Sequence, residues 1–340
     1  MEPAAGQFSG RHRTGARHRP LGQRLPWWRD QLRQPVDRRR QRLRRQVRRR
    51  GHETLGAPAR FRRKRPRAVD HRRRRWQRDC GRLHRGDLFA PNGGSNGPDL
   101  FVAKYDRDGS LIWGRQLGTD TTDNAAGVAT DAAGNIYLTG YTFGSLDANS
   151  NAGDADAFLV KYDRDGVKLW TRQFGSVDQD IATAIAVDST GHPYVVGRTV
   201  GALGGAPNAG GLDAFVVKFD ATGTPVWTRQ FGSAADDYAY GVALDAEDDV
   251  VVIGSTLGAL AQTTGLGGTD AFTVKLDGAG AFLWLRQSGT AGDDHAYGVG
   301  IDALGNVFTA GHTAGSLDGN SSAGDIDMFV VKHQADGKRR

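Results

Sequence analysis

The chain has very little of several features on which small folds and active sites depend. One cysteine, Cys80, and two methionines stand among 340 residues, which excludes a disulfide framework and any site built from paired cysteines. No apolar run reaches the roughly 18 residues of a membrane-spanning helix, and no signal peptide is readable. Gly-x-Ser-x-Gly, phosphate-cradling glycine loops and His-Glu-x-x-His are all missing. The sequence therefore offers no ready-made catalytic centre.

A repeat of 57 residues is what the sequence has in abundance. Its most visible members are four tryptophans: Trp113, Trp170, Trp227 and Trp284. The same interval separates Asp-x-Phe motifs that begin at Asp99, Asp156, Asp213, Asp270 and Asp327. An Arg-Gln pair follows two residues after each tryptophan. A fixed period of this size indicates one folded unit copied in series.

Alternation of apolar and polar residues dominates each unit, and helical periodicity is absent. In the second copy we expect strands at 157–163, 167–175, 181–188 and 193–197, followed by a glycine-rich stretch that returns to the next unit. Four short antiparallel strands in a unit of this length are typical of a propeller blade, whose sheets stack and bury both faces. We therefore predict an all-β fold, a β-propeller of four-stranded antiparallel blades. Its expected repeats are 99–155, 156–212, 213–269, 270–326 and a partial copy at 327–340.

The run at 213–245, DAFVVKFD followed by WTRQFG and DDYAYGVALD, resembles the bacterial seven-bladed beta-propeller repeat (SBBP repeat) family. The resemblance covers residues 99–340 and implies a bacterial cell-surface or secreted protein. One departure is Asp248, where the other copies have Gly134, Gly191 and Gly305. Four copies and the start of a fifth make an incomplete propeller, and the next tryptophan is due at position 341, one residue past the last.

Residues 1–86 differ sharply from the rest. They hold 29 of the 45 Lys and Arg residues and 6 of the 38 Asp and Glu residues. Read one nucleotide late, the codons of residues 55–62 permit Trp-Ala-Arg-Gln-Leu-Gly-Ser, and those of 40–49 permit Asp-Ser-Ala-Phe-Val-Ala-Lys-Tyr-Asp. We therefore expect residues 1–86 to be a frameshifted reading of one blade and part of another. The alternative is a genuine, disordered arginine-rich arm.

The charge of the remainder reverses that of the whole chain. Residues 87–340, the expected partial propeller, carry 16 basic against 32 acidic side chains, a net charge of −16 instead of +7. This balance argues against a nucleic-acid partner. Because four and a quarter blades leave strand edges and a blade face open, we expect self-association through those edges.

The repeated polar residues are the most obvious candidates for function. The Arg-Gln pairs, the acids Asp123, Asp180, Asp237 and Asp294, and Lys104 with its equivalents recur in every copy. Catalysis needs one asymmetric cluster and not several equivalent ones, so we interpret these residues as hydrogen-bonded struts within or between blades.

Two acidic, Asn-rich loops are candidates for calcium, because oxygen ligands at alternate positions suit this ion. The candidate ligands are Asp147, Asn149, Asn151, Asp154 and Asp156 in the first loop, and Asp318, Asn320, Asp325 and Asp327 in the second. The alternative for both is a solvated, turn-rich loop. No other cofactor is expected.

The histidines share no spacing, and we interpret each of His192, His295 and His312 as an ordinary surface variant, the alternative being a ligand. The leading hypothesis is a non-enzymatic scaffold that presents variable loops to a protein, glycan or ion. One alternative is a propeller hydrolase or lyase whose site lies in blades outside this chain. Another is a decayed or mis-framed gene product without function.

Overall fold

The computed structural model describes residues 78–84, 89, 97–260 and 263–339. The chain divides into two units at residues 70 and 71. All described residues belong to the second unit, and the frameshift prediction for 1–86 falls mostly outside them. Residues 78–84 form a strand in this unit, whereas the sequence placed the domain boundary at residues 86 and 87.

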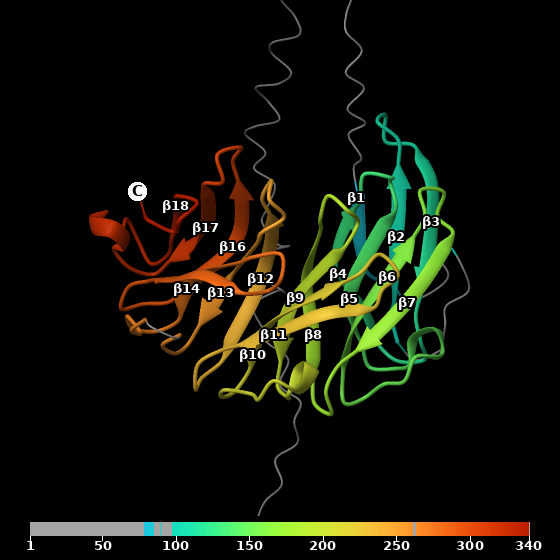
Figure 1. Cartoon of the computed structure of the whole chain (residues 1–340), viewed down its shortest axis with the longest axis horizontal. Helices are drawn as coiled ribbons and strands as arrows, with labels where there is room; N and C mark the ends of the chain where they lie inside the picture. The colour runs from blue at the N-terminus through green and yellow to red at the C-terminus, as the bar shows by residue number, and fades with distance from the viewer. Residues whose placement is uncertain (1–77, 85–88, 90–96, 261–262, 340) are drawn as a thin grey trace, which may run out of the picture. The chain divides into compact units, whose positions relative to one another are not determined.

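The described part is built from strands in five antiparallel sheets, with only three single-turn 3-10 segments (Figure 1). The first sheet comprises β1 (Arg78–His84), β2 (Asp99–Tyr105) and β3 (Leu111–Leu117). The second comprises β4 (Asp123–Thr130), β5 (Ile136–Thr142), β6 (Asp156–Tyr162) and β7 (Lys168–Phe174). The third comprises β8 (Asp180–Val187), β9 (Pro193–Thr199), β10 (Asp213–Phe219) and β11 (Pro225–Phe231).

The fourth sheet comprises β12 (Asp237–Leu244), β13 (Val250–Thr256), β14 (Asp270–Leu276) and β15 (Phe282–Ser288). The fifth comprises β16 (Asp294–Ile301), β17 (Val307–Thr313) and β18 (Asp327–His333). The 3-10 segments are η3 (Leu146–Ala148), η4 (Leu203–Gly205) and η5 (Leu317–Gly319). The prediction of four-stranded antiparallel blades is confirmed.

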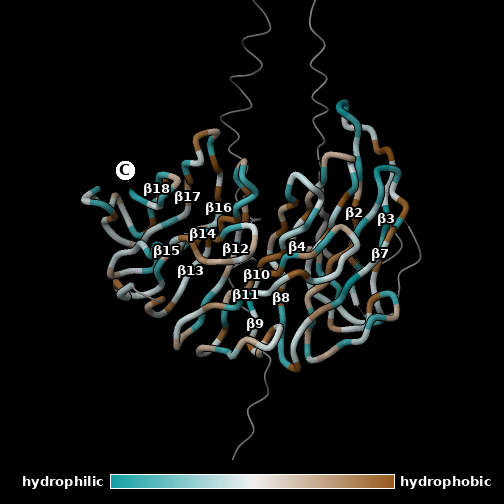
Figure 2. Tube along the Cα trace, viewed as in Figure 1, coloured by the Kyte–Doolittle hydropathy of each residue, from teal (hydrophilic) through white to brown (hydrophobic). Residues whose placement is uncertain are grey.

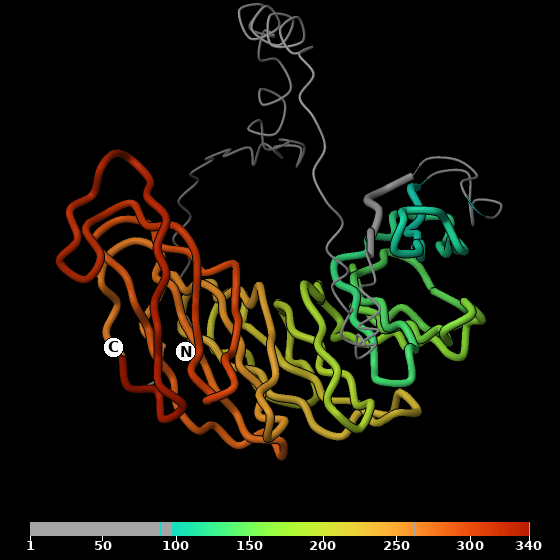
Figure 3. Tube along the Cα trace, turned by 90° about the horizontal axis from the view of Figure 1, so that it is seen from above, coloured from blue at the N-terminus to red at the C-terminus, as the bar shows by residue number. Residues whose placement is uncertain are grey.

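Successive sheets lie side by side in chain order (Figure 3). The first strands of neighbouring sheets contact one another, β4 against β8, β8 against β12, and β12 against β16. We call these the inner strands and the fourth strands the outer strands. The sheets of the described part do not close into a ring, as expected for an incomplete propeller.

Each sheet is out of phase with the sequence repeat. β5 ends one repeat and β6 begins the next, yet they pair with each other, with Gly140 opposite Phe158. The expectation that the glycine-rich stretch leads from blade to blade is therefore wrong, since residues 143–155 connect two strands of one sheet. The short segment 175–179 between β7 and β8 makes the step to the next blade.

Both faces of a central blade are buried. Hydrophobic segments, brown in Figure 2, recur along the strands of the sheets. On β6, Leu159 joins a core shared with the third sheet, while Phe158 and Val160 join a core that includes Leu100 of the first sheet. Every residue of β6 is buried. A strand with a neighbouring sheet on each face has no solvent side, and strict alternation is lost.

A glycine on each second strand fits against the inner strand of its own sheet. A Cβ added at Gly254 would lie 1.8 Å from the carbonyl oxygen of Tyr238, and one at Gly311 would lie 1.8 Å from that of His295. The inner strand bulges by one residue at this point, at Tyr240 and Tyr297 respectively. Glycine is required here because the backbones approach too closely for any side chain.

Candidate functional site

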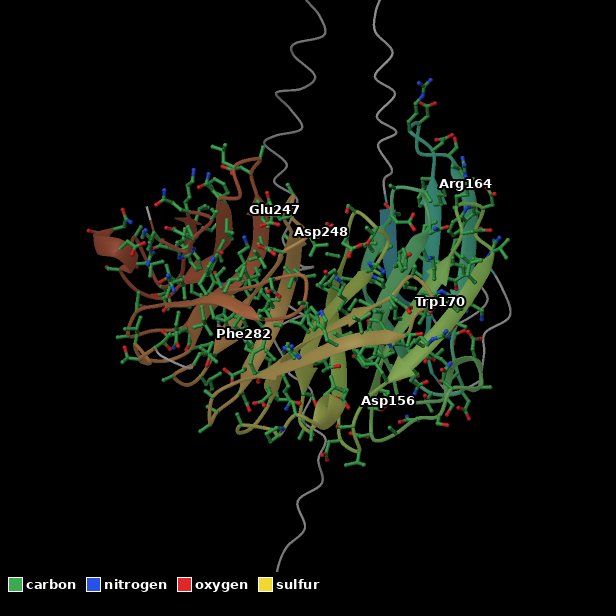
Figure 4. The ribbon with its side chains drawn as sticks, viewed as in Figure 1. Asp156, Arg164, Trp170, Glu247, Asp248 and Phe282 are labelled. Carbon is green, nitrogen blue, oxygen red and sulfur yellow. The ribbon has the colours of Figure 1, made fainter. Side chains whose placement is uncertain are left out.

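The repeated glutamine and aspartate tie each outer strand to its own sheet. Gln173 Nε2 on β7 donates to Asp156 Oδ2 at 3.0 Å and to the carbonyl oxygen of Gly144 at 2.9 Å. Gln173 Oε1 accepts from the backbone N–H of Leu146 at 2.9 Å. Gln230 and Gln287 make the same three bonds in the next two sheets. Asp156, labelled in Figure 4, starts β6 and is fully buried. The Gln173 amide therefore stabilises the fold.

The repeated arginine ties each outer strand to the following blade. Arg172 Nε donates to the carbonyl oxygen of Gly223 at 3.1 Å, and its guanidinium lies over the ring of Trp170 with Cζ 5.3 Å from the centroid. The lysines act similarly, since Lys161 Nζ donates to the carbonyl oxygen of Ala221. The equivalent arginine bonds join Arg115 to Gly166, Arg229 to Gly280 and Arg286 to Gly337. The interpretation of these residues as struts is confirmed.

The repeated acid at the start of each inner strand hydrogen-bonds to the short segment that connects one blade to the next. Asp123 Oδ2 accepts from the backbone N–H of Thr119 at 2.6 Å, and its Oδ1 accepts from Thr142 Oγ1 at 2.5 Å. Burial raises the pKa of the Asp123 carboxyl, against these hydrogen bonds, which lower it. Burial likewise raises the pKa of Asp180 and of Asp237. These carboxyls are structural.

Most side chains of the first calcium candidate loop have partners within the protein. Asp147 forms an ion pair with Lys168 at 2.5 Å. Asn149 Nδ2 donates to the carbonyl oxygen of Leu146, and Asn151 Oδ1 accepts from the backbone N–H of Gly153. Asp156 belongs to the glutamine network, and Asp154 is exposed.

The second loop repeats this pattern. Asp318 pairs with Arg339, Asn320 Nδ2 donates to the carbonyl oxygen of Leu317, and Asp327 Oδ2 accepts from the backbone N–H of Ala323. Asp325 is exposed. Among the residues that the structure describes, no three His, Cys, Asp or Glu side chains gather into a group able to hold a metal ion. Calcium binding by these loops stays a prediction.

The structure instead brings together residues that differ from blade to blade. The second residue of each inner strand faces a residue on the second strand, and these cross-strand pairs are Asn124–Tyr141, Ile181–Arg198, Tyr238–Ser255 and His295–His312. The bulged residue two positions later adds Tyr240 and Tyr297 in the last two sheets. A specific binding or catalytic site requires residues that differ from blade to blade in this way. The repeated strut residues do not differ between blades.

These side chains form one continuous group across three sheets, which we call the aromatic row: Arg198, Tyr238, Tyr240, Tyr297, His295 and His312. Arg198 lies over Tyr238, with Cζ 5.3 Å from the ring centroid. Tyr238 stacks on Tyr240 with centroids 6.0 Å apart, and Tyr240 approaches Tyr297 to 5.2 Å across the boundary between the fourth and fifth sheets. Tyr297 then stacks on His295 at 5.8 Å.

Aspartates lie beside the aromatic row, one at each of the last two blade connections. Tyr238 Oη donates to Asp236 Oδ2 at 3.1 Å, and burial together with this carboxylate raises the pKa of Tyr238 to about 12. Burial lowers the pKa of His295, and His312 lowers it further, while Asp293 and Asp294 act in the opposite direction. Tyr297 remains 52% exposed. The aromatic row thus combines an accessible ring with both hydrogen-bond donors and acceptors.

His295 and His312 share no spacing in the repeat, yet their ring centroids lie 5.0 Å apart. The two positions are 17 residues apart and face each other only because of the bulge at Tyr297. A regular hairpin about the turn at Asp302 would have placed Thr313 opposite His295. His192, the third of these histidines, contacts its own turn instead, with a hydrogen bond between its Nδ1 and Thr190 Oγ1.

Known proteins agree with this architecture. The beta-propeller repeat family, SBBP, matches residues 112–147 and 283–318, each beginning one residue before a repeated tryptophan. The resemblance of this chain to SBBP beta-propeller repeats is therefore confirmed at these two positions. Within its described residues, this SBBP-repeat chain has no helix long and apolar enough to cross a membrane.

Two curated proteins resemble this SBBP-repeat chain in sequence. The regulatory protein FlaEY of Caulobacter vibrioides is 29% identical over 279 residues, which cover 70% of this chain and 29% of the relative. A WD repeat-containing protein of Acanthamoeba polyphaga mimivirus is 24% identical over 199 residues, which cover 46% and 14% respectively. The chain thus spans less than a third of the length of either relative.

Among solved structures, a gluconolactonase from Xanthomonas campestris has a TM-score of 0.37 and 15% identity, with coverage of 71% of this chain and 70% of that protein. An apocarotenoid oxygenase from Synechocystis has a TM-score of 0.38 and 11% identity, with coverage of 75% and 60%. Both are distant likenesses.

Proposed function

We propose that this chain is a non-enzymatic binding scaffold of the bacterial surface or exterior, and that its aromatic row takes a neutral or amino-sugar glycan. The location follows from the resemblance to exported repeat proteins. The binding role follows from the division of the polar residues into two sets. The repeated set has structural partners in sheet after sheet, and the blade-specific set gathers in the aromatic row.

The single observation that supports the ligand class is the array of three tyrosines on β12 and β16. Apolar faces of pyranose rings pack against aromatic rings by burial of C–H surface and by dispersion. Flanking donors and acceptors such as Arg198 and Asp236 then fix orientation, as in other small-molecule sites. The net charge of −16 over residues 87–340 disfavours an acidic polysaccharide.

The full chain should be tested by affinity electrophoresis in gels that contain xylan, mannan, mixed-linkage glucan or chitosan. We expect retardation by at least one of these, and about tenfold weaker binding in the double variant Tyr240→Ala/Tyr297→Ala. Phe282→Ala is the matched control. Phe282, labelled in Figure 4, is a 48% exposed aromatic residue on the outer strand β15, whereas Tyr240 and Tyr297 lie on the inner strands β12 and β16.

Three outcomes would overturn this proposal. One is the absence of retardation by all four polysaccharides, and another is equal binding by the double variant. The third is release of reducing ends from a bound glycan, which would support the propeller hydrolase or lyase alternative. Circular dichroism should confirm that each variant is folded, so that a loss of binding is assigned to the aromatic row.

A further inference from the structure

Two histidines at the end of the aromatic row face each other on neighbouring strands. His295 lies on the inner strand β16 and His312 on β17, and their Cα atoms are register partners. The imidazole centroids are 5.0 Å apart, with an angle of 61° between the ring planes. Each ring also approaches Tyr297, with centroid distances of 5.8 Å for His295 and 5.5 Å for His312.

One ring nitrogen of His295 is available to coordinate an ion. His295 Nδ1 is buried and has no hydrogen-bond partner among the described residues. A buried polar atom of this kind normally finds a partner. Burial lowers the pKa of His295, and His312 lowers it further. Neutral imidazole is the form that binds metal ions.

The separation of the rings matches shared coordination of one ion. Two imidazole nitrogens at about 2.0–2.1 Å from an ion, with a tetrahedral angle between them, place the ring centres about 5 Å apart. Two imidazoles as close as these, facing one another from adjacent strands, are therefore already spaced for chelation. The backbone pairing of β16 with β17 holds both residues, so little ordering is needed on binding.

We propose that His295 and His312 together bind one divalent transition-metal ion of the imidazole-preferring class, for which Cu²⁺, Ni²⁺ and Zn²⁺ are the probes. Water completes the coordination, because no third His, Cys, Asp or Glu of the described residues joins the pair. The equivalent positions in the preceding three sheets carry no histidine pair, which gives one site in the described part of the chain.

This site goes beyond the proposed glycan binding and does not rest on it, although both histidines belong to the aromatic row. Ion binding is measured on the untagged full chain without any polysaccharide, so that failure of one proposal leaves the other standing. With only two protein ligands, affinity should follow the Irving–Williams order, with Cu²⁺ bound more tightly than Ni²⁺ or Zn²⁺. Protons compete for the same nitrogens, so affinity should fall as the pH falls from 7.5 to 5.5.

Two measurements test the site. Calorimetric titration with Ni²⁺ should show one equivalent fewer in His295→Gln and in His312→Gln than in the wild-type chain. His192→Gln is the control and should retain the wild-type stoichiometry. Electron paramagnetic resonance of Cu²⁺, added at half an equivalent, should show coupling to two imidazole nitrogens in the wild-type chain and to fewer in each variant of the pair.

Unchanged stoichiometry and affinity in both variants of the pair would overturn the proposal. A wild-type Cu²⁺ spectrum with coupling to one nitrogen or none would do the same. The second measurement needs no variant, so it decides the question even if a substitution disturbs folding.

Discussion

Arg229 Nε on β11 donates a hydrogen bond to the carbonyl oxygen of Gly280, 2.7 Å away and 51 residues later in the chain. Gly280 stands in the turn before β15, so this bond joins the outer strand of one blade to the next blade. The same bond recurs from Arg115, Arg172 and Arg286. Stability of the array therefore depends on links between neighbours as well as on each sheet, as expected of repeat proteins.

Replacing this arginine should weaken the link between two blades. We expect Arg229→Lys to lower the free energy of unfolding by about 1–3 kcal/mol, because the planar guanidinium is lost and the Gly280 carbonyl is left without its donor. Urea unfolding followed by tryptophan fluorescence measures the change. Arg164→Lys, at an exposed turn position, is the control and should stay within about 0.5 kcal/mol of wild type. Equal stability of the two variants would contradict the role of this link.

Asp248 replaces a turn glycine of the other copies and links two turns. Its φ is +62°, in the left-handed region that favours glycine, and it follows Glu247 in the turn after β12 (Figure 4). Its carboxylate accepts from the backbone N–H of Ser189 at 3.1 Å and from Ser189 Oγ at 2.6 Å, in the preceding blade. The aspartate thus adopts an unfavourable backbone conformation, and its hydrogen bonds to Ser189 link two blades.

Two substitutions at Asp248 separate these effects. Asp248→Ala keeps the backbone conformation and loses the bonds, so we expect it to destabilise by about 1–2 kcal/mol. Asp248→Gly loses the same bonds but relieves the left-handed conformation, so it should remain within about 0.5 kcal/mol of wild type. Ser189→Ala should add little in the Asp248→Ala background, in a double-mutant cycle by urea unfolding. Full additivity would show that the two side chains act independently.

Asp123 should give stability an unusual pH dependence. Burial raises the pKa of this carboxyl in the folded protein above its ordinary value of 3.8. Its contribution to stability is then fully present below about pH 3.8 and is lost as the pH rises through the folded pKa. The wild-type chain should therefore gain stability relative to Asp123→Asn as the pH is lowered from 7 to 4.5.

Urea unfolding of both proteins at the two pH values measures this difference. Asp120→Asn, at an exposed position three residues earlier, is the control for general acid effects. A wild-type advantage that shrinks at low pH would mean that the hydrogen bonds from Thr119 and Thr142 outweigh burial.

The acidic loops provide a test of the calcium prediction. Because Asp147 and Asp318 already pair with basic side chains, we expect calcium to bind these loops no more tightly than about 10⁻³ M. Calorimetric titration of the wild-type chain measures the affinity, and Asp154→Asn with Asp325→Asn tests whether the exposed acids contribute. A micromolar affinity lost in that double variant would show that the loops rearrange to form a calcium site.

Much of the architecture was predictable because it repeats. The expected strand at 181–188 appears as Asp180–Val187, and that at 193–197 as Pro193–Thr199. Local alternation and turn residues act over a few positions, and the 57-residue period confirms them in several copies. The strut role of Gln173 and Arg172 was predictable for the same reason, since function rarely uses equivalent groups in every blade.

The candidate site was not predictable in the same way. Its members differ from copy to copy, so no spacing marks them, and Tyr240 and Tyr297 come together only because the fourth and fifth sheets pack against each other. Likewise, the apolar run on β6 does not reveal that this strand pairs with a strand of the preceding repeat.

The sequence by itself determined the period, the strands and the residues that recur, because these depend on short-range backbone preferences repeated along the chain. Only the tertiary structure decided which strands share a sheet and which side chains of different blades meet. The physical reason is clearest at Tyr297, where one bulged residue shifts the register and brings His312 opposite His295. The 57-residue repeat does not reveal a shift of one residue in strand pairing.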